Sequence, residues 1–302
     1  MKKVDLSVVV LNYNTKEIVL DCLKSIYEHT ENVSFEVVVV DNGSTDGSQA
    51  AVGNLKSQIS NLKLVQNIKN LGFAKGNNRA RNVVTGEYIL FLNSDTLLIE
   101  NTFKKTVDYI KNKPEIGAIT VKQILPSGKL DRDCRRSFPT PWVALTHFSG
   151  LDRFFPKSKL LGRYWRGYLS EDETQEVEVI QGSFFLSLKK VLDEVGWFDE
   201  DYFLNGEDID LSWKIRRAGY RNVYYPKTSI IHLKGATKGK RGSMIKQPLK
   251  KRIKYALAGV DAMELFYKKR LFKNYPMYVT WLVIVGIRLM KLARVTREII
   301  RL

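Results

Sequence analysis

The chain has 302 residues, of which 44% are hydrophobic and 27% carry a charge. A chain of this length can bury a full hydrophobic core, and its apolar content excludes a largely disordered protein. Its two cysteines, Cys22 and Cys134, are too few for a disulfide framework, which favours a reduced, cytoplasmic setting. We expect Cys22, on the apolar side of a helical pattern, to be a small core residue.

The positive charge is concentrated at one end of the chain. The formal net charge is +17, yet residues 234–302 alone contain 18 Lys and Arg against three Asp and Glu. The first 233 residues are therefore almost neutral. This distribution indicates that the C-terminal part meets an anionic partner, either a membrane surface or a nucleic acid.

In the N-terminal third, short apolar runs alternate with helical patterns. Residues 1–5 lead directly into the first run, without a signal-peptide pattern. Short connections between the runs predict a right-handed α/β layer, with a mostly parallel central sheet covered by helices on both faces. The expected strands are 6–11, 35–40, 62–66 and 88–92, and the expected helices are 16–28, one from Ser44 or Asp46 to Leu55, and one ending near Gly86.

The chain changes character after residue 125. Residues 126–175 mix proline, glycine, aromatic residues and arginines with weak periodicity, so they form either a flexible region facing a bound molecule or ordinary irregular cover. Regular structure then resumes. The expected strands are 176–188, 223–225 and 229–232, and the expected helices are 189–195 and one from Glu207 to Gly219, a good C-terminal cap.

The segment after residue 234 is expected to be helical. Residues 277–287 form an apolar stretch of about 11 residues, roughly 17 Å as a helix against about 30 Å of hydrocarbon, which is too short to span a bilayer. Beyond it, basic and apolar side chains fall on opposite sides of a helical wheel, which favours a helix in the plane of a membrane. The alternative is a basic helix docked on its own domain or on a second subunit. The basic set is Arg288, Lys291, Arg294, Arg297 and Arg301, and the apolar set is Leu289, Leu292, Val295, Ile299 and Leu302.

Carboxylates follow two of the predicted strands directly. Asp41 follows the second strand, and Asn93, Ser94 and Asp95 follow the fourth. Open α/β sheets bind ligands at the carboxyl ends of their strands, so these acids indicate a site for a nucleotide and a metal-bound phosphate. Asp41 could accept the N3–H of a pyrimidine ring or cap the next turn. Asp95 could ligate a divalent cation that neutralises a diphosphate, or cap a helix.

Two further candidates lie downstream. In the acidic run that begins at Glu207, Asp208 could remove a proton from an attacking hydroxyl, while Glu207 and Asp210 could position it or cap the helix. His232 could ligate the same cation or simply pack at the end of its strand. Residues 70–78 lack G-x-x-x-x-G-K-[ST], and no G-x-G-x-x-G follows the first strand, which disfavours ATPase and dehydrogenase functions.

Five motifs, in this order and spacing across residues 4–235, resemble those of glycosyltransferase family 2. Their details are most similar to the bacterial rhamnosyltransferase branch, which builds cell-wall and O-antigen polysaccharides on lipid carriers. The resemblance implies a GT-A fold over residues 1–235, with a donor half at about 1–125 and an acceptor half at about 126–235, followed by a basic helical region, 236–302, that associates with a membrane. The motifs are Leu11-Asn12-Tyr13-Asn14, Val39 to Gly47, Asn70 to Asn78, Leu92-Asn93-Ser94-Asp95, and Trp197 to Glu200 with Glu207 to Leu211.

The resemblance also implies an inverting single displacement from a nucleotide-diphosphate sugar, with dTDP-L-rhamnose as the expected donor. Asp41 would bind the pyrimidine base, Asn12 would lie against the nucleoside, and Asp208 would be the catalytic base. Asp95 and His232 would ligate Mg²⁺ or Mn²⁺. Further donor contacts are implied for Lys75, Asn77, Asn93 and Ser94.

The implied acceptor is a polyprenyl-diphosphate-linked glycan, met by an enzyme bound peripherally to the inner face of the cell membrane. Glu207, Trp197 and Lys238 would contact this acceptor. The basic run 235–241 would clamp one of the diphosphates or remain a solvated loop. A homodimer is compatible with the sequence, and no nucleic-acid partner is expected. The usual metal motif of the family is Asp-x-Asp, and this chain has Asn93 at its first position.

Three other interpretations can be compared with this one. A UDP-hexose donor within the same family would keep every motif. A nucleotidyltransferase would need a glycine-rich, basic loop after the first strand, where this chain has Asn12 to Thr15. A basic nucleic-acid-binding protein without catalysis would explain the tail, but it leaves the pattern of Asp41, Asp95 and Asp208 without a purpose.

Overall fold

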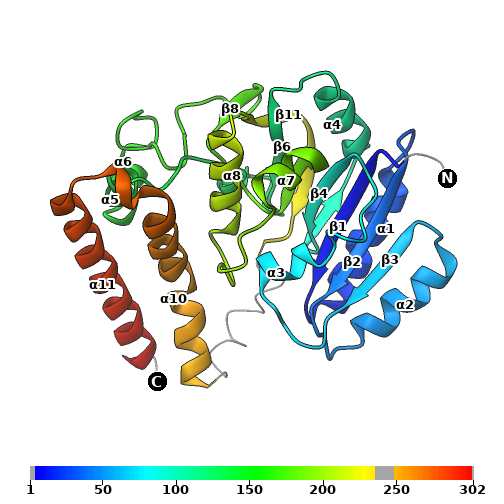
Figure 1. The fold of residues 1–302 in the computed structure, drawn as a ribbon, viewed down its shortest axis with the longest axis horizontal. Coiled ribbons are helices and arrows are strands. Elements are labelled where there is room, and N and C mark those ends of the chain that lie inside the picture. Colours follow the sequence, from blue (N-terminus) through cyan, green and yellow to red (C-terminus); the bar gives the residue numbers. More distant parts are fainter. Residues whose placement is uncertain (1–3, 235–247, 301–302) are drawn as a thin grey trace.

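The structure is a computed structural model that describes residues 4–234 and 248–300. Within these residues, a nine-stranded mixed sheet forms the centre of the molecule, and helices pack on both of its faces (Figure 1). In spatial order its strands are β3 (Leu62–Gln66), β2 (Phe35–Asp41), β1 (Leu6–Asn12), β4 (Tyr88–Asn93), β10 (Phe184–Leu188), β6 (Ile116–Ile124), β11 (Arg221–His232) and β5 (Thr96–Leu98), with β8 (Gln175–Val177) paired to β11.

Four strands form a parallel unit within the sheet. β1 pairs in parallel with β2 and β4, and β2 pairs in parallel with β3. The valines at 8–10 and 37–40 are fully buried. Because β-branched side chains suit a strand covered on both faces, these runs form central strands. The predicted α/β class and the mostly parallel sheet are confirmed.

The helices of the N-terminal half follow the expected order. α1 (Lys16–His29) buries Cys22 in the core, as expected, and burial raises the pKa of this thiol to about 12. α2 (Ser48–Gln58) begins just after Asp46, which accepts hydrogen bonds from the amide and the hydroxyl of Ser48. The other helices of the sheet region are α3 (Phe73–Asn78), α4 (Thr102–Ile110), the 3-10 turn η1 (Arg132–Cys134), α5 (Pro141–Phe148), α6 (Leu151–Phe154), α7 (Lys189–Val195) and α8 (Glu207–Arg217).

Three expected elements differ from the structure. The helix predicted to end near Gly86 is the short α3, because tight i to i+3 turns follow it, such as the 3.0 Å bond from the Ala80 amide to the Asn77 carbonyl. The strand predicted at 176–188 is divided into β8, β9 (Val179–Ile180) and β10. β9 leaves the main sheet and pairs with β7 (Arg135–Arg136) in a separate two-stranded sheet.

The two strands predicted at 223–225 and 229–232 are one strand, β11. Its register against β6 shifts between Tyr225 and Ser229. Pro226 lies within this interval and cannot donate a backbone hydrogen bond, which explains the interruption.

The C-terminal part folds as two antiparallel helices beside the sheet (Figure 1). Lys291 of the second helix forms ion pairs of 2.6 Å with Asp261 and Glu264 of the first. The expected helical tail is therefore present. Among the described residues, no helix combines the length and the hydropathy that a membrane span requires. In chain order the elements are α10 (Leu249–Phe266), the π turn η2 (Tyr267–Leu271), the 3-10 turn η3 (Phe272–Asn274) and α11 (Met277–Ile300).

Candidate active site

A buried carboxylate lies where β1 and β2 end. Asn12 is opposite Asp41 in the register of these strands, and Asp41 is only 1% exposed. One oxygen of Asp41 accepts a hydrogen bond from Asn12 Nδ2 at 2.8 Å. The other accepts from the Ser44 amide and from Gln49 Nε2, also at 2.8 Å. Asp41 thus holds the turn after β2, and three donors fix its orientation.

The loop before α3 closes against this turn. Asn42 Nδ2 donates to the Gly72 carbonyl at 3.0 Å. Gly72 has a φ of +86°, and a Cβ at this position would lie 2.4 Å from the carbonyl oxygen of Phe203. Only glycine therefore permits this approach. The loop before α3 thus contacts both the turn after β2 and the loop that precedes α8.

Lys75 and Asn77 of α3 differ in accessibility. The Lys75 side chain is half exposed, and its ammonium lies 3.5 Å from a carboxylate oxygen of Glu200. Asn77 is buried and donates to the Phe73 carbonyl within its own helix at 3.0 Å. Lys75 is thus free to turn toward a ligand, while the Asn77 amide is engaged in α3.

Asp95 faces His232 at the same edge of the sheet. Both are almost completely buried, and His232 Nε2 lies 3.4 Å from Asp95 Oδ1. That oxygen has no hydrogen-bond partner of good geometry among the described residues, and its contact with the His232 imidazole is electrostatic. A buried carboxylate oxygen without such a partner, next to an imidazole nitrogen, fits a divalent cation. The described residues contain no cluster of three His, Cys, Asp or Glu that could hold a metal alone, so a ligand would have to complete the coordination.

Asp131 fixes the orientation of His232. Its Oδ2 lies 2.8 Å from His232 Nδ1, and its Oδ1 accepts a hydrogen bond from Lys234. Burial alone would lower the pKa of His232, but the carboxylates of Asp131 and Asp95 raise it to about 9. Burial would likewise raise the pKa of Asp131, but His232 and Lys234 lower it to about 2. Asp131 thus holds Nδ1 and leaves Nε2 directed at Asp95.

Asp208 lies in the first turn of α8, buried beside an arginine. Its Oδ2 accepts hydrogen bonds from Arg136 at 2.6 Å and from the Gly182 amide at 3.3 Å. Asp208 is 7% exposed and Arg136 is 9% exposed. Burial opposes the charge of Arg136, but the adjacent Asp208 carboxylate raises its pKa above the ordinary value. The guanidinium therefore stays charged and holds the carboxylate in one orientation.

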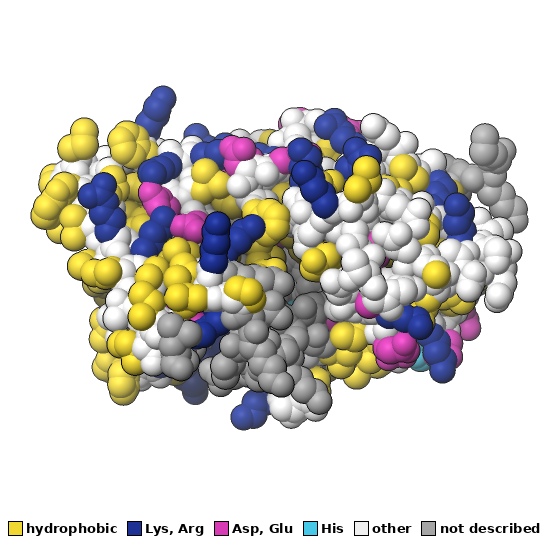
Figure 2. All heavy atoms as spheres, turned by 90° about the horizontal axis from the view of Figure 1, so that it is seen from below, with side chains coloured by type: hydrophobic (Ala, Val, Ile, Leu, Met, Phe, Trp, Pro, Cys, Tyr) yellow, Lys and Arg dark blue, Asp and Glu magenta, His cyan; other side chains and the backbone are white. Residues whose placement is uncertain are grey.

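Backbone contacts connect Asp208 to the end of β4. Ser183, the residue after Gly182, accepts a hydrogen bond from the Asn93 amide at 3.1 Å. Antiparallel pairing of β10 with β4 continues from this point. The structure therefore brings the acids predicted after β2, after β4 and at the start of α8 to one edge of the sheet. Figure 2 views the molecule from below Figure 1, where its surface is hollowed near the middle.

The sequence model of Glycosyl transferase family 2 matches residues 7–196, more than half of the chain. The chain belongs to this family. It is therefore a glycosyltransferase, and the resemblance inferred from its motifs is confirmed.

Two relatives of this glycosyltransferase have names that refer to different sugars. The N-acetylglucosaminyl-diphospho-decaprenol L-rhamnosyltransferase of Mycobacterium tuberculosis is 28% identical over 216 residues, 68% of this chain and 68% of that protein. The poly-beta-1,6-N-acetyl-D-glucosamine synthase of Staphylococcus aureus is 24% identical over 281 residues, 88% of this chain and 58% of that protein. The first similarity supports the bacterial rhamnosyltransferase branch.

Solved structures confirm the fold. The mannosyltransferase PcManGT from Pyrobaculum calidifontis, in complex with GDP-Man and Mn²⁺, gives a TM-score of 0.57 at 19% identity and covers 100% of this chain and 87% of its own. S. aureus TarS 1–349, in complex with UDP-GlcNAc, gives a TM-score of 0.56 at 20% identity and covers 85% and 66%. At these identities the likeness is one of architecture, which is the GT-A fold.

The structure bears on one of the acceptor contacts predicted for the glycosyltransferase, that of Trp197. Trp197 is fully buried, its ring centroid lies 5.8 Å from that of Phe91, and its Nε1 donates to Asp193 at 2.8 Å. Because none of its surface is exposed, the structure does not support an acceptor contact by Trp197. Lys238 and the rest of the basic run 235–241 lie outside the described residues.

The acids beside Asp208 have different surroundings. Asp210 is fully buried and accepts two hydrogen bonds from Arg270 of η2, at 2.7 and 3.1 Å. Glu207 is 6% exposed. The N-cap position of α8 is Gly206, and no side chain caps it. Asp210 therefore joins α8 to the C-terminal part and does not cap the helix.

Four contacting residues of the site were missed by the sequence analysis. Gln49 bonds Asp41 only eight positions away, but the other three join positions 60 or more residues apart, which no local motif encodes. The one available signal was the charged cluster 131–136, inside a region otherwise rich in aromatic residues, proline and glycine. The four residues are Gln49, Asp131, Arg136 and Arg270.

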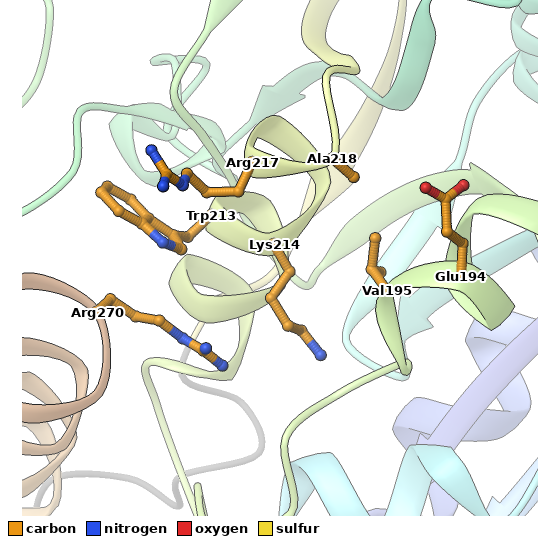
Figure 3. Close-up of a pocket in the computed structure, with 7 residues that line it drawn as sticks. All are labelled: Glu194, Val195, Trp213, Lys214, Arg217, Ala218 and Arg270. Atoms are coloured by element: carbon orange, nitrogen blue, oxygen red, sulfur yellow. The ribbon is translucent and has the colours of Figure 1, made fainter.

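A separate cavity of about 310 Å³ lies between α7, α8 and η2 (Figure 3). Figure 3 shows the Lys214 side chain extending from α8 toward the space beside α7. Its lining comes from the C-terminal half of α8, the end of α7 and Arg270 of η2, whereas Asp208 is in the first turn of α8, so this cavity is not the site described above. The lining residues are Glu194, Val195, Trp213, Lys214, Arg217, Ala218 and Arg270.

Proposed function

We propose that this glycosyltransferase transfers L-rhamnose from dTDP-L-rhamnose to a polyprenyl-diphosphate-linked glycan, with inversion at the sugar C1. The observation that carries the proposal is the meeting of Asp41, Asp95 and Asp208 at one sheet edge. Similarity to the mycobacterial L-rhamnosyltransferase supports the choice of sugar and of a lipid-linked acceptor. Residues 1–125 would bind the donor, residues 126–235 the acceptor, and the basic region after them a membrane.

Asp41 would recognise the base of the donor. Asn12, Ser44 and Gln49 direct its carboxylate, which can accept the N3–H of a pyrimidine. Thymine and uracil both carry this donor, so Asp41 does not choose between dTDP and UDP. The remaining proposed donor contacts at this edge are Lys75, Asn77, Asn93 and Ser94.

Asp95 and His232 would hold Mg²⁺ or Mn²⁺ against the donor diphosphate. The cation would neutralise the charge that develops on the leaving diphosphate. Because Asn93 replaces the usual first Asp, the protein offers one carboxylate and one imidazole, and phosphate and water oxygens would supply the other ligands. Asp131 keeps His232 in the orientation that this role requires.

Asp208 would be the general base. The acceptor hydroxyl oxygen forms a bond to the sugar C1 as the bond from C1 to the donor diphosphate breaks, and the hydroxyl proton passes to Asp208. Arg136 and the Gly182 amide both bind Oδ2 of Asp208 and keep the carboxylate in place. Glu207 beside it would contact the acceptor.

The proposed location is the inner face of the cell membrane, as a peripheral protein. The support is the basic C-terminal region together with exposed apolar side chains along α11. Figure 2 shows hydrophobic and basic side chains intermixed over the side formed by α10 and α11. The most exposed of the apolar side chains are Met277, Tyr278, Trp281, Leu282, Leu289, Leu292 and Ile300.

A UDP-linked donor is the second candidate. The S. aureus poly-beta-1,6-N-acetyl-D-glucosamine synthase and the TarS complex with UDP-GlcNAc favour it. A nucleic-acid-binding protein without catalysis is no longer a candidate, because the chain belongs to a glycosyltransferase family.

Calorimetric titration with a panel of nucleoside diphosphate sugars, with and without Mn²⁺, tests the proposal. We expect dTDP-L-rhamnose to bind selectively and to need Mn²⁺, and Asp95→Ala to abolish the metal requirement together with most of the affinity. Exposed Asp108→Asn on α4 is the matched control. Selective binding of a UDP-sugar would keep the mechanism and replace the donor, and binding of no donor would reject the proposal.

A further inference from the structure

The region around α5 and α6 presents large apolar side chains to solvent. Phe154 is 79% exposed, Leu160 62% and Leu145 59%. The Trp142 indole donates to the Leu160 carbonyl at 3.1 Å, which holds α5 next to the segment after α6. A group of exposed large apolar residues of this kind indicates a surface that meets another apolar phase. We call the following set the α5–α6 surface: Trp142, Leu145, Phe148, Phe154, Phe155 and Leu160.

Exposed cations alternate with these apolar residues. Arg153, Lys157 and Lys159 are exposed, and none forms an ion pair with a described residue. Asp152, the single acid between residues 151 and 160, is buried and lies 2.6 Å from His147 Nδ1. The α5–α6 surface therefore offers positive charge and aromatic rings, with no exposed carboxylate between them.

The α5–α6 surface adjoins the start of α11. The side chains of Tyr275 and Thr140 lie close enough to interact, which places the residue before α5 next to the turn before α11. Figure 1 shows α5 and α6 beside the N-terminal end of α11. The first turns of α11 expose Tyr278 and Trp281 by 69% and 63%. Two apolar surfaces that are more than a hundred residues apart in the chain thus lie next to each other.

The apolar side of α11 is also directed outward. Lys291 pairs with Asp261 and Glu264 of α10, and Arg294 donates to the Ala256 carbonyl at 2.8 Å. Leu289 and Leu292 are meanwhile 61% and 64% exposed. α11 therefore binds α10 partly through basic residues and leaves apolar ones uncovered.

We propose that the α5–α6 surface is a second membrane contact, which inserts its aromatic rings into an anionic bilayer beside α11. Cations interleaved with aromatic residues suit the interface of a bilayer with acidic headgroups. A second copy of this chain fits less well, because a symmetric interface would bring the same unpaired cations together on a protein of net charge +17. Two adjoining contacts would also fix how the sheet edge faces the lipid-linked acceptor. The inference rests on the proposed membrane location and is independent of the donor sugar.

The test is flotation of the full chain with phosphatidylcholine vesicles, with or without phosphatidylglycerol. We expect F154S/F155S to lower the fraction bound to anionic vesicles about tenfold, because two exposed rings no longer insert. K157E/K159E should weaken binding to anionic vesicles in the same way. The matched controls are Ile99→Ser and Lys56→Glu, which change one exposed apolar and one exposed basic residue elsewhere and should leave binding unchanged.

Every other outcome would contradict one part of this membrane-contact proposal. Full binding by both variants, with loss in W281S/L282S, would assign the membrane contact to α11 alone. Full vesicle binding with loss of self-association in analytical ultracentrifugation would assign the surface to a second copy. Loss of transfer to a short-chain, water-soluble acceptor would place the surface in the acceptor site. If the unaltered chain binds no vesicles, the membrane location also fails, while the donor titration still tests the chemistry.

Discussion

At the scale of single side chains, the three acids of the site are held in different ways. Three donors orient Asp41, and Arg136 with one backbone amide orients Asp208. Asp95 keeps one buried oxygen without a hydrogen-bond partner of good geometry among the described residues. Because the His232 imidazole approaches that oxygen at 3.4 Å, we propose that the first two acids serve recognition and proton transfer and that the third binds a ligand through it.

Replacement of the proposed base tests this division of roles. Asp208→Asn keeps an oxygen that can accept from Arg136, so the local structure should persist, but it removes the group that takes the proton. We expect kcat to fall about 10³-fold while the donor Kd changes less than about twofold. Transfer rates and donor titration measure the two quantities. A large loss of donor affinity would contradict the role of Asp208 as base.

The residue types of the site were predictable, but their partners were not. The sequence places Asp41, Asp95 and Asp208 by their position after strands and at a helix start, which local pattern encodes. Asp131 and Arg136 reach their partners only through the folded sheet, across 101 and 72 positions of chain. No periodicity records such a contact, so only the tertiary structure identifies them.

At the scale of elements, α8 is held at its start from two sides. Arg136 of β7 binds Asp208 on one side, and Arg270 of η2 binds Asp210 on the other. A Cβ on Gly206, just before α8, would lie 2.9 Å from Ala262 of α10, which shows how closely the C-terminal part approaches. A π turn often occurs where a helix serves a function, and here it directs Arg270 at the catalytic-site helix.

Removal of the Arg270 contact should affect catalysis before donor binding. Arg270→Ala leaves the fully buried Asp210 without its cation, which should lower the free energy of unfolding by about 3 kcal/mol and kcat at least about tenfold. Arg270→Lys should restore part of both. Lys268→Ala, which also changes a cation of η2 but loses only its pair with Glu264 at the end of α10, is the control. A wild-type kcat in Arg270→Ala would show that η2 does not position α8. Denaturant unfolding measures the loss of stability, and donor titration measures donor binding.

Periodicity predicted the buried central strands but not the breaks between short ones. The all-apolar valine runs of β1 and β2 have one stable environment, which is a covered parallel sheet. Parts of the segment 176–188 are as apolar as those valine runs. Its middle piece, β9, nevertheless lies outside the main sheet and pairs with β7. The packed fold determines which strand a two-residue strand pairs with. The local sequence of β9 therefore could not predict its partner.

At the scale of the whole molecule, the C-terminal region packs on the rest of the fold and also carries most of the protein's net positive charge. Phe266 and Tyr267 are buried in the main core, while α11 exposes most of its large apolar residues. If α11 binds a membrane as proposed, the boundary between the structural part and the membrane part falls near Tyr275, after η2, and not at the start of the basic region.

Truncation after Tyr275 tests this boundary. It removes α11 and keeps Arg270 on Asp210, so binding to anionic vesicles should fall about tenfold or more while transfer to a short-chain soluble acceptor is retained. W281S/L282S, which keeps α11 on α10, separates lipid contact from the loss of a helix. Unchanged flotation of both variants would reject the membrane role of the tail, and circular dichroism checks that the remaining domain is folded.

The sequence by itself determined the family, the α/β class, the succession of strands and helices in the N-terminal half and the choice of three candidate acids, because each depends on local pattern and on motif spacing. Only the tertiary structure decided that Asp131 orients His232, that Arg136 holds Asp208, that Arg270 ties the tail to α8, and that α5 lies beside α11. These are contacts between segments distant in the chain, and their energies arise only when burial brings the charges and rings together.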